Sequence, residues 1–264
     1  MSAHASPPLP LDSVVSQLRA AGCVFAEDEA ELILSTARTP QEAAAMVARR
    51  AAGLPLEHVV GWAAFRGLRI AVGPGVFVPR RRTEFLVERA AGLLPPRPVV
   101  VDLCCGSGAL GVALVAGLDA FELHAADVEP AAVRCARRNV VPAGGRVHEG
   151  DLFDALPADL RGRVDVLLAN VPYVPSGEVG LLPAEARAHE PLVALDGGSD
   201  GLDVLRRVTA EAPRWLAPGG HLLFETGERQ VADALDAVAR SGLTASVARS
   251  DEQSATVIVG TRPV

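Results

Sequence analysis

Lysine is absent from this sequence of 264 residues, in which all 25 basic residues are arginines. This absence excludes enzymes that bind their substrate as a lysine Schiff base and nucleotide-binding proteins that need a P-loop lysine. Aromatic residues make up only 4% of the chain, so a core must be built chiefly from Ala, Val and Leu. The longest apolar stretch, residues 99–121, is interrupted by two aspartates and four glycines, so we expect no membrane segment.

Cysteine and histidine are few and show no metal-binding pattern. The four cysteines have no CxxC spacing, and a disulfide between the adjacent Cys104 and Cys105 would be strained. The six histidines are scattered singly along the chain. The first residues lack the basic cluster and apolar core of a secretory signal. We therefore predict a soluble cytoplasmic protein with reduced thiols and no metal.

The formal net charge of −7 is distributed unevenly. Residues 1–60 carry four arginines against seven acidic residues, residues 61–97 seven against two, and residues 98–264 fourteen against twenty-three. Overall acidity argues against nucleic-acid binding, because a binding face must neutralise phosphates. We therefore expect no stable nucleic-acid complex, while the basic excess in residues 61–97 requires its own explanation.

The pattern of apolar residues divides the chain into successive segments. Residues 1–10 are expected to form a disordered tail, residues 11–61 a helical N-terminal domain, and residues 62–82 a β-hairpin linker. Within residues 83–264, where Thr83 is placed to cap a helix, strands alternate with helices, which predicts a mostly parallel sheet with helices on both faces. The expected strands are 99–103, 121–126, 146–148, 164–169, 220–225, 245–248 and 255–260, and the expected helices are 108–117, 129–139, 201–215 and 227–241.

A glycine-rich loop follows the first strand of the alternating region. The pattern GxGxxG is formed by Gly106, Gly108 and Gly111, and Asp127 ends the next strand, as in dinucleotide-binding folds. However, Asp102 would repel a pyrophosphate, whereas it would attract the ammonium and sulfonium groups of S-adenosylmethionine. The loop therefore favours S-adenosylmethionine as the cofactor. Plainer interpretations are a helix cap for Asp127 and a solvated strand-end acid for Asp102.

Two further motifs follow later strands. Asp151 and Leu152 are suited to accept from the adenine amino group and to stack on its ring, although a simple turn explains them nearly as well. Asn170-Val171-Pro172-Tyr173 follows a strand at the sheet edge where such folds bind ligands. An amide or amino nitrogen is hard to methylate because its lone pair is delocalised, and two acceptors that hold its N–H groups can orient it. The Asn170 side chain and the Val171 carbonyl are such acceptors, Pro172 keeps Val171 extended, and Tyr173 supplies a flat wall.

Taken in order, these motifs resemble the HemK-type protein-(glutamine-N5) methyltransferases. The resemblance extends from about residue 55 to residue 260, and it also includes Gly75-Val-Phe-Val-Pro-Arg80 and Phe224-Glu-Thr-Gly227. It implies a helical N-terminal domain, a hairpin linker and a class I methyltransferase domain with a Rossmann-like, mostly parallel seven-stranded sheet. It also implies S-adenosylmethionine as cofactor and, as substrate, a protein with an exposed glutamine, as in the Gly-Gly-Gln loop of peptide chain release factors. The candidate cofactor residues are Asp102, Cys104, Cys105, Gly106, Ser107, Gly108, Asp127, Asp151, Leu152 and Asn170, and the candidate catalytic residues are Asn170, Val171, Pro172 and Tyr173.

The chain departs from the family pattern at three places. Val171 replaces the first proline of the substrate motif, and Cys104 replaces the first glycine of the cofactor loop. Where the family commonly has Arg-Pro-Glu-Thr-Glu, this chain has Arg80-Arg81-Arg82-Thr83-Glu84. We expect Arg80, Arg81, Arg82 and Thr83 to line the substrate entrance. Our hypothesis is that the arginines recruit an unusually acidic substrate, or RNA beside it, while the plain alternative is a solvated basic turn.

Other functions stay open at this point. An adenine amino-methyltransferase would use the same Asn-x-Pro-Tyr logic on a flipped base, and a small-molecule methyltransferase would also fit the motifs. A nicotinamide-dependent dehydrogenase would share the glycine loop but leaves Asp102 and Asn170 unexplained. A binding protein with a degenerate site is a further alternative, because both Cys104 and Val171 are unusual for the family.

Overall fold

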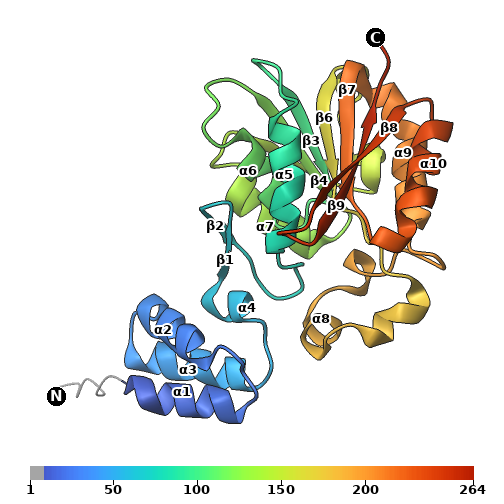
Figure 1. Cartoon of the computed structure of the whole chain (residues 1–264). Helices are drawn as coiled ribbons and strands as arrows, with labels where there is room; N and C mark the ends of the chain where they lie inside the picture. The colour runs from blue at the N-terminus through green and yellow to red at the C-terminus, as the bar shows by residue number, and fades with distance from the viewer. Residues whose placement is uncertain (1–8) are drawn as a thin grey trace.

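The computed structural model describes residues 9–264, so the tail expected at residues 1–10 lies almost wholly outside the described residues. A small group of helices at the N-terminal end is joined through a hairpin to a larger α/β body (Figure 1). A segment containing helix α8 (Ala184–His189) lies below the sheet on the side of the N-terminal helices. No helix within residues 9–264 is long and apolar enough to cross a membrane.

The N-terminal helices have an apolar core of their own, which includes Val14, Leu18, Ile33 and Met46. Helix α3 starts at Pro40, which suits the first turn of a helix, and the Thr39 hydroxyl accepts a hydrogen bond from the Glu42 amide at 3.1 Å. The helices of this group are α1 (Leu11–Ala20), α2 (Ala26–Thr36), α3 (Pro40–Ala51) and α4 (Leu56–Val60).

A two-stranded antiparallel hairpin, β1 (Trp62–Phe65) and β2 (Leu68–Ala71), follows the helices. Its turn is made by Arg66 and Gly67, whose φ angles of 46° and 74° are those that a two-residue hairpin turn requires. Phe65 and Ile70 are buried and belong to the core of the larger body, so the hairpin is packed against that body rather than freely hinged.

The sheet has the order β5-β4-β3-β6-β7-β9-β8, in which β9 runs antiparallel to both its neighbours and the other pairs are parallel. This arrangement confirms the predicted class I methyltransferase fold. The strands are β3 (Val99–Leu103), β4 (Glu122–Asp127), β5 (Arg146–Glu149), β6 (Val164–Ala169), β7 (Leu216–Glu225), β8 (Thr244–Ser250) and β9 (Ala255–Thr261).

Helices cover both faces of the sheet. One face packs against α5 (Glu84–Ala91), α6 (Ala109–Val115) and α7 (Pro130–Val140), whose apolar residues share one core. The opposite face packs against α9 (Asp203–Trp215) and α10 (Val231–Arg240), which share a second core. Strand β3 lies near the centre of the sheet, and its carboxyl end therefore opens between these layers, where α/β folds bind ligands.

Some boundaries differ from those predicted. Strand β7 begins at Leu216 rather than at residue 220, because Pro218-Gly219 lies within the strand instead of preceding it. Helix α10 begins at Val231 rather than at residue 227, since residues 228–230 form a separate 3₁₀ turn. Residues 170–200, where no helix was predicted, contain α8 and short 3₁₀ turns.

Candidate active site

A pocket of about 720 Å³ opens at the carboxyl ends of β3, β4 and β6. Most residues predicted from the sequence line it together, although they come from segments far apart in the chain. Gly108, Arg81 and Thr83 do not line it. The predicted residues in its wall are Arg80, Arg82, Asp102, Cys104, Cys105, Gly106, Ser107, Asp127, Asp151, Leu152, Asn170, Val171, Pro172 and Tyr173.

The glycine loop turns sharply from β3 into α6 through left-handed backbone conformations. Gly106 and Gly108 have φ angles of 55° and 77°, and Cys104 adopts φ 52°, which costs a non-glycine residue energy. A Cβ atom on Gly108 would lie 2.5 Å from Val140 of helix α7. Gly108 thus serves close packing behind the loop, which explains why it does not line the pocket.

Asp102 is the last residue but one of β3 and is completely buried beneath the glycine loop. Its Oδ2 atom accepts a hydrogen bond from the Gly111 amide at 2.9 Å, while its Oδ1 atom has no partner among the described residues. The solvated strand-end interpretation is therefore wrong. Burial raises the pKa of Asp102 to about 7. An unpaired carboxylate oxygen in a pocket wall is suited to a cationic ligand.

Asp127 ends β4 and holds two backbone segments in place. Its Oδ2 atom accepts from the Gly106 amide at 2.8 Å, and its Oδ1 atom accepts from the Glu129 amide at 2.9 Å. Burial raises the pKa of this carboxyl group. A carboxylate offers about four acceptor sites, so Asp127 can fix the loop and the start of α7 and still bind ligand hydroxyls.

Asp151 and Leu152 line the same pocket. Arg207 of helix α9 donates to Asp151 Oδ2 at 2.6 Å, an ion pair that the sequence did not predict. Leu152 adopts φ 48°, which turns the chain after β5 and holds the Leu152 side chain in the pocket wall.

Cys104 and Cys105 are poor nucleophiles here, because burial raises the pKa of both thiols.

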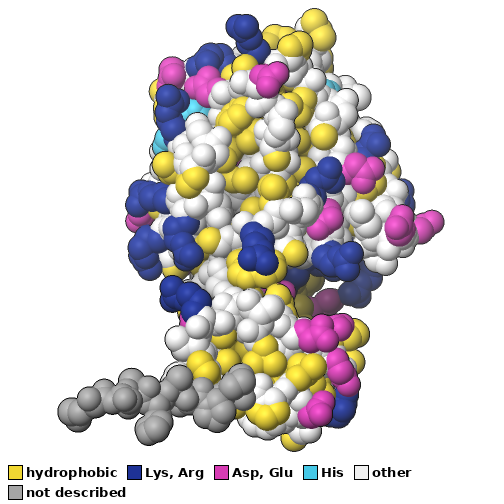
Figure 2. Space-filling view, turned by 90° about the vertical axis from the view of Figure 1, so that its left-hand side faces the viewer, with side chains coloured by type: hydrophobic (Ala, Val, Ile, Leu, Met, Phe, Trp, Pro, Cys, Tyr) yellow, Lys and Arg dark blue, Asp and Glu magenta, His cyan; other side chains and the backbone are white. Residues whose placement is uncertain are grey.

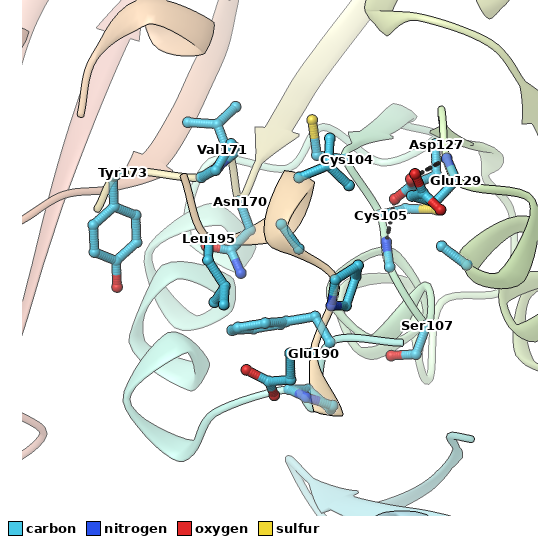
Figure 3. Close-up of a pocket in the computed structure, with 18 of the residues that line it drawn as sticks. Cys104, Cys105, Ser107, Asp127, Glu129, Asn170, Val171, Tyr173, Glu190 and Leu195 are labelled. Atoms are coloured by element: carbon cyan, nitrogen blue, oxygen red, sulfur yellow. Dashed lines mark hydrogen bonds between the residues drawn. The ribbon is translucent and has the colours of Figure 1, made fainter. Parts of the chain in front are cut away.

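The Asn170–Tyr173 segment leaves β6 at the other end of the pocket. In Figure 3, Asn170, Val171 and Tyr173 lie on one side of the view and Asp127 and Glu129 on the other. Within residues 9–264, neither the Asn170 side chain nor the Val171 carbonyl makes a hydrogen bond. Both acceptors predicted from the sequence, the Asn170 side chain and the Val171 carbonyl, are therefore available to a ligand.

Tyr173 is held in place by a buried carboxylate for which the sequence predicts no role. Glu225, at the end of β7, accepts from the Tyr173 hydroxyl at 3.0 Å and from the Thr83 hydroxyl at 2.7 Å. Arg82 forms an ion pair with Glu225 at 2.7 Å and also contacts the Tyr173 hydroxyl. Thr83 is thus a buried partner of Glu225 and does not line the pocket entrance, so that prediction is wrong. It does occupy the N-cap position of α5, as predicted, but its side chain makes no capping hydrogen bond.

The remaining arginines of the 80–82 cluster behave differently from one another. Arg80 forms an ion pair with Glu190, at 2.6 and 2.7 Å from its two carboxylate oxygens, which connects the segment after the hairpin to the segment containing α8. Arg81 is exposed and lies outside the pocket wall. Arg80 and Arg82 are both neutralised by buried acids, so the cluster does not present three free charges at the entrance.

Histidines on neighbouring strands come together away from the pocket. His124 of β4 and His148 of β5 are hydrogen-bonded through their ring nitrogens at 2.8 Å, and Glu122 lies 3.1 Å from the other nitrogen of His124. Across the described part of the chain, no group of three or more His, Cys, Asp or Glu side chains is arranged to hold a metal ion.

Comparison with known proteins adds to this geometry. A family model for the methyltransferase small domain matches residues 68–185. The chain is 38% identical over 228 residues to a release factor glutamine methyltransferase of Geobacter sulfurreducens, covering 84% of this chain and 79% of that protein. It is 40% identical over 193 residues to a 4-amino-L-phenylalanine/4-methylamino-L-phenylalanine methyltransferase of Streptomyces pristinaespiralis, covering 70% and 61%. A methyltransferase structure from Pyrococcus furiosus matches with a TM-score of 0.56 and 15% identity, covering 75% and 90%.

The sheet order, the pocket at its carboxyl edge and these similarities define a class I methyltransferase that uses S-adenosylmethionine. More narrowly, the chain belongs to the release factor glutamine methyltransferase family. The family resemblance and the cofactor predicted from the motifs are thereby confirmed. The roles of the individual pocket residues remain predictions.

Proposed function

We propose that this enzyme methylates the side-chain amide nitrogen of a glutamine in a release factor or a related protein. The observation that carries the proposal is the pair of unpartnered acceptors, the Asn170 side chain and the Val171 carbonyl, in the same pocket as the unpartnered Asp102 oxygen. The Asn170–Tyr173 segment thus fits a primary amide, and Asp102 in the same pocket fits a cation.

The cofactor end fits S-adenosylmethionine on the chemistry of its donors and acceptors. Asp102 would attract the positive charge of the methionine moiety, and Asp127 would accept from the ribose hydroxyls. Asp151 and Leu152 would contact adenine, and residues 104–107 would form the backbone wall between these groups. When bound, the cofactor supplies an electrophilic methyl group on a sulfonium.

The substrate end would act by orientation. A primary amide has two N–H donors, and the Asn170 oxygen and the Val171 carbonyl can accept one each, which turns the nitrogen toward the methyl group. Tyr173 would cover one face of the amide, with its ring held by Glu225 and Arg82. Tyr173 is unsuited to act as a base, because burial raises the pKa of its phenol. Positioning therefore accounts for the catalysis we propose.

The partner and the location belong to the same proposal. The substrate is a protein whose glutamine stands on an exposed loop narrow enough to enter the pocket. A cytoplasmic location is supported by the four cysteines, all of which are free thiols.

The test is to incubate the purified protein with S-adenosylmethionine labelled in the methyl group and a release factor containing a Gly-Gly-Gln loop. Mass spectrometry should place the label on the glutamine of that loop, and a release factor with this glutamine replaced by alanine should remain unlabelled. Parallel reactions contain 4-amino-L-phenylalanine, suggested by the relative from Streptomyces pristinaespiralis, or adenine-containing RNA. Label on either of these, with none on the release factor, would overturn the proposal.

A further inference from the structure

Two long stretches of the chain contain no acidic residue, and they meet on one face of the molecule. Residues 58–83 and 130–148 are the longest stretches without Asp or Glu, and both contain several arginines. Residues 58–83 include the β1–β2 hairpin, and residues 130–148 include helix α7. In the view of Figure 2, arginine side chains gather in a band at the height of the hairpin. The band lies on the side of the molecule that faces left in Figure 1.

Among the exposed arginines of these stretches are four that we call the arginine face. Arg134, Arg137 and Arg138 stand three and four residues apart on α7, which places them on one side of the helix, and Arg69 stands on β2. None of the four forms an ion pair with any residue from 9 to 264. Their charge is therefore not neutralised by the described residues, in contrast to that of Arg80 and Arg82.

The hairpin and α7 are fixed to one another, so the arginine face is a preformed surface. The Asn139 side chain accepts from the Ala71 amide and donates to the Ala71 carbonyl, both at 2.9 Å. The Cys135 thiol donates to the same carbonyl at 3.0 Å. Little backbone ordering is therefore needed before a partner docks here.

One feature of this surface favours nucleic acid over an acidic protein, and a second fits a phosphate group. The Arg69 guanidinium lies 4.2 Å from the centroid of the Trp62 ring, and its outer face offers a flat cation on which a base can stack. Arg134 and Arg138 line a hollow of about 180 Å³ beside Gly73 and Pro74, which is large enough to admit a phosphate group. A single guanidinium group can donate hydrogen bonds to two phosphate oxygens at once.

We propose that the arginine face binds single-stranded RNA. The bound strand would lie beside the active site, because residues 73–77 separate the hollow from the main pocket: Gly73 and Val76 line the hollow, whereas Gly75 and Phe77 line the pocket. Net charge misses this surface because it averages a basic face with an acidic remainder. The proposal is independent of the identity of the methylated substrate.

The experiment measures the fluorescence anisotropy of a labelled, unstructured RNA of about 20 nucleotides, longer than the sites that single-strand-binding domains occupy. The full chain should bind it, and the affinity should fall with salt with a log–log slope of about −3, as expected for four neutralised phosphates. A triple variant, Arg134→Glu, Arg137→Glu and Arg138→Glu, should bind at least about tenfold more weakly at low salt and with a flatter slope.

A charge-matched control variant carries Arg38→Glu, Arg214→Glu and Arg240→Glu, three highly exposed positions on other elements. It should bind RNA nearly as well as the unsubstituted chain. Both variants should still bind S-adenosylmethionine and methylate the release factor, which separates this proposal from the proposed function. The proposal is overturned if the chain binds no RNA at low salt, if the control loses as much affinity as the triple variant, or if a polyglutamate peptide of equal charge binds as tightly.

Discussion

Replacing Asp102 by asparagine should make the protein more stable without cofactor and a weaker binder of S-adenosylmethionine. Asp102 is fully buried, and within residues 9–264 one of its oxygens has no hydrogen-bond donor. Asparagine has nearly the same shape, and its oxygen can still accept from the Gly111 amide. The substitution therefore removes the charge and leaves the packing of the glycine loop in place.

The magnitude follows from the pKa of Asp102, which burial raises from 3.8 to about 7. Each pKa unit corresponds to about 1.4 kcal/mol, so ionising Asp102 in the folded, cofactor-free protein costs about 4 kcal/mol. Because the folded state holds this proton more tightly than the unfolded state, the free energy of unfolding should fall as pH rises from about 4 to about 7. A buried, unpaired amide in the variant costs about 1–3 kcal/mol, which leaves a net gain of about 1–3 kcal/mol at pH 8.

Cofactor binding should change in the opposite direction. A hydrogen bond to a charged group contributes about 1.5–3 kcal/mol, so the variant should bind S-adenosylmethionine about 10- to 100-fold more weakly at pH 8. The affinity of the unsubstituted enzyme should rise as pH increases through 7, and that of the variant should not. Urea denaturation and titration calorimetry at pH 6 and 8 measure both effects. Equal affinities of the two proteins at pH 8 would refute the role assigned to Asp102.

Two further substitutions test the loop and the tyrosine support. Cys104→Gly should raise the free energy of unfolding by about 1 kcal/mol, because Cys104 adopts φ 52°. Urea denaturation measures this change. A destabilised variant would show that packing of the thiol matters more than backbone strain. Glu225→Gln removes the ion pair with Arg82 and loosens Tyr173, so the KM for the protein substrate should rise about tenfold while the Kd for S-adenosylmethionine stays constant. Steady-state kinetics and calorimetry separate these quantities, and a parallel loss of cofactor affinity would contradict a role confined to the substrate end.

The sheet was predictable from the sequence because each of its strands is bounded by local signals. Val99–Leu103 and Val164–Ala169 are apolar runs that end at a glycine loop and at Asn170, and both strands have the predicted bounds. Residues 170–200 were not predictable in the same way. Their short turns depend on contacts with distant residues, such as the ion pair between Arg80 and Glu190, rather than on a periodic pattern.

The candidate site was predictable where single residues follow strands, and less so where pairing decides their role. Asp127 and Asn170 line one pocket as their positions after parallel strands imply. The sequence could not show that Asp102 is fully buried, nor that Arg82 is paired with Glu225, which lies more than a hundred residues further along the chain. The position of Glu225 at the end of a strand was a usable sign of a site residue, since β7 lies next to β6. Nothing in the sequence indicated that Arg82 is its partner.

The central claim is that Asn170 orients the amide that receives the methyl group, and the most direct test compares Asn170→Ala with the unsubstituted enzyme. The measurement is kcat/KM for methylation of the release-factor glutamine, with the Kd for S-adenosylmethionine measured in parallel. Removal of one positioned acceptor should lower kcat/KM by about a hundredfold, as for other preorganised hydrogen-bonding groups, and should leave the Kd nearly unchanged. Methylation of the glutamine at an undiminished rate by the variant would contradict the account.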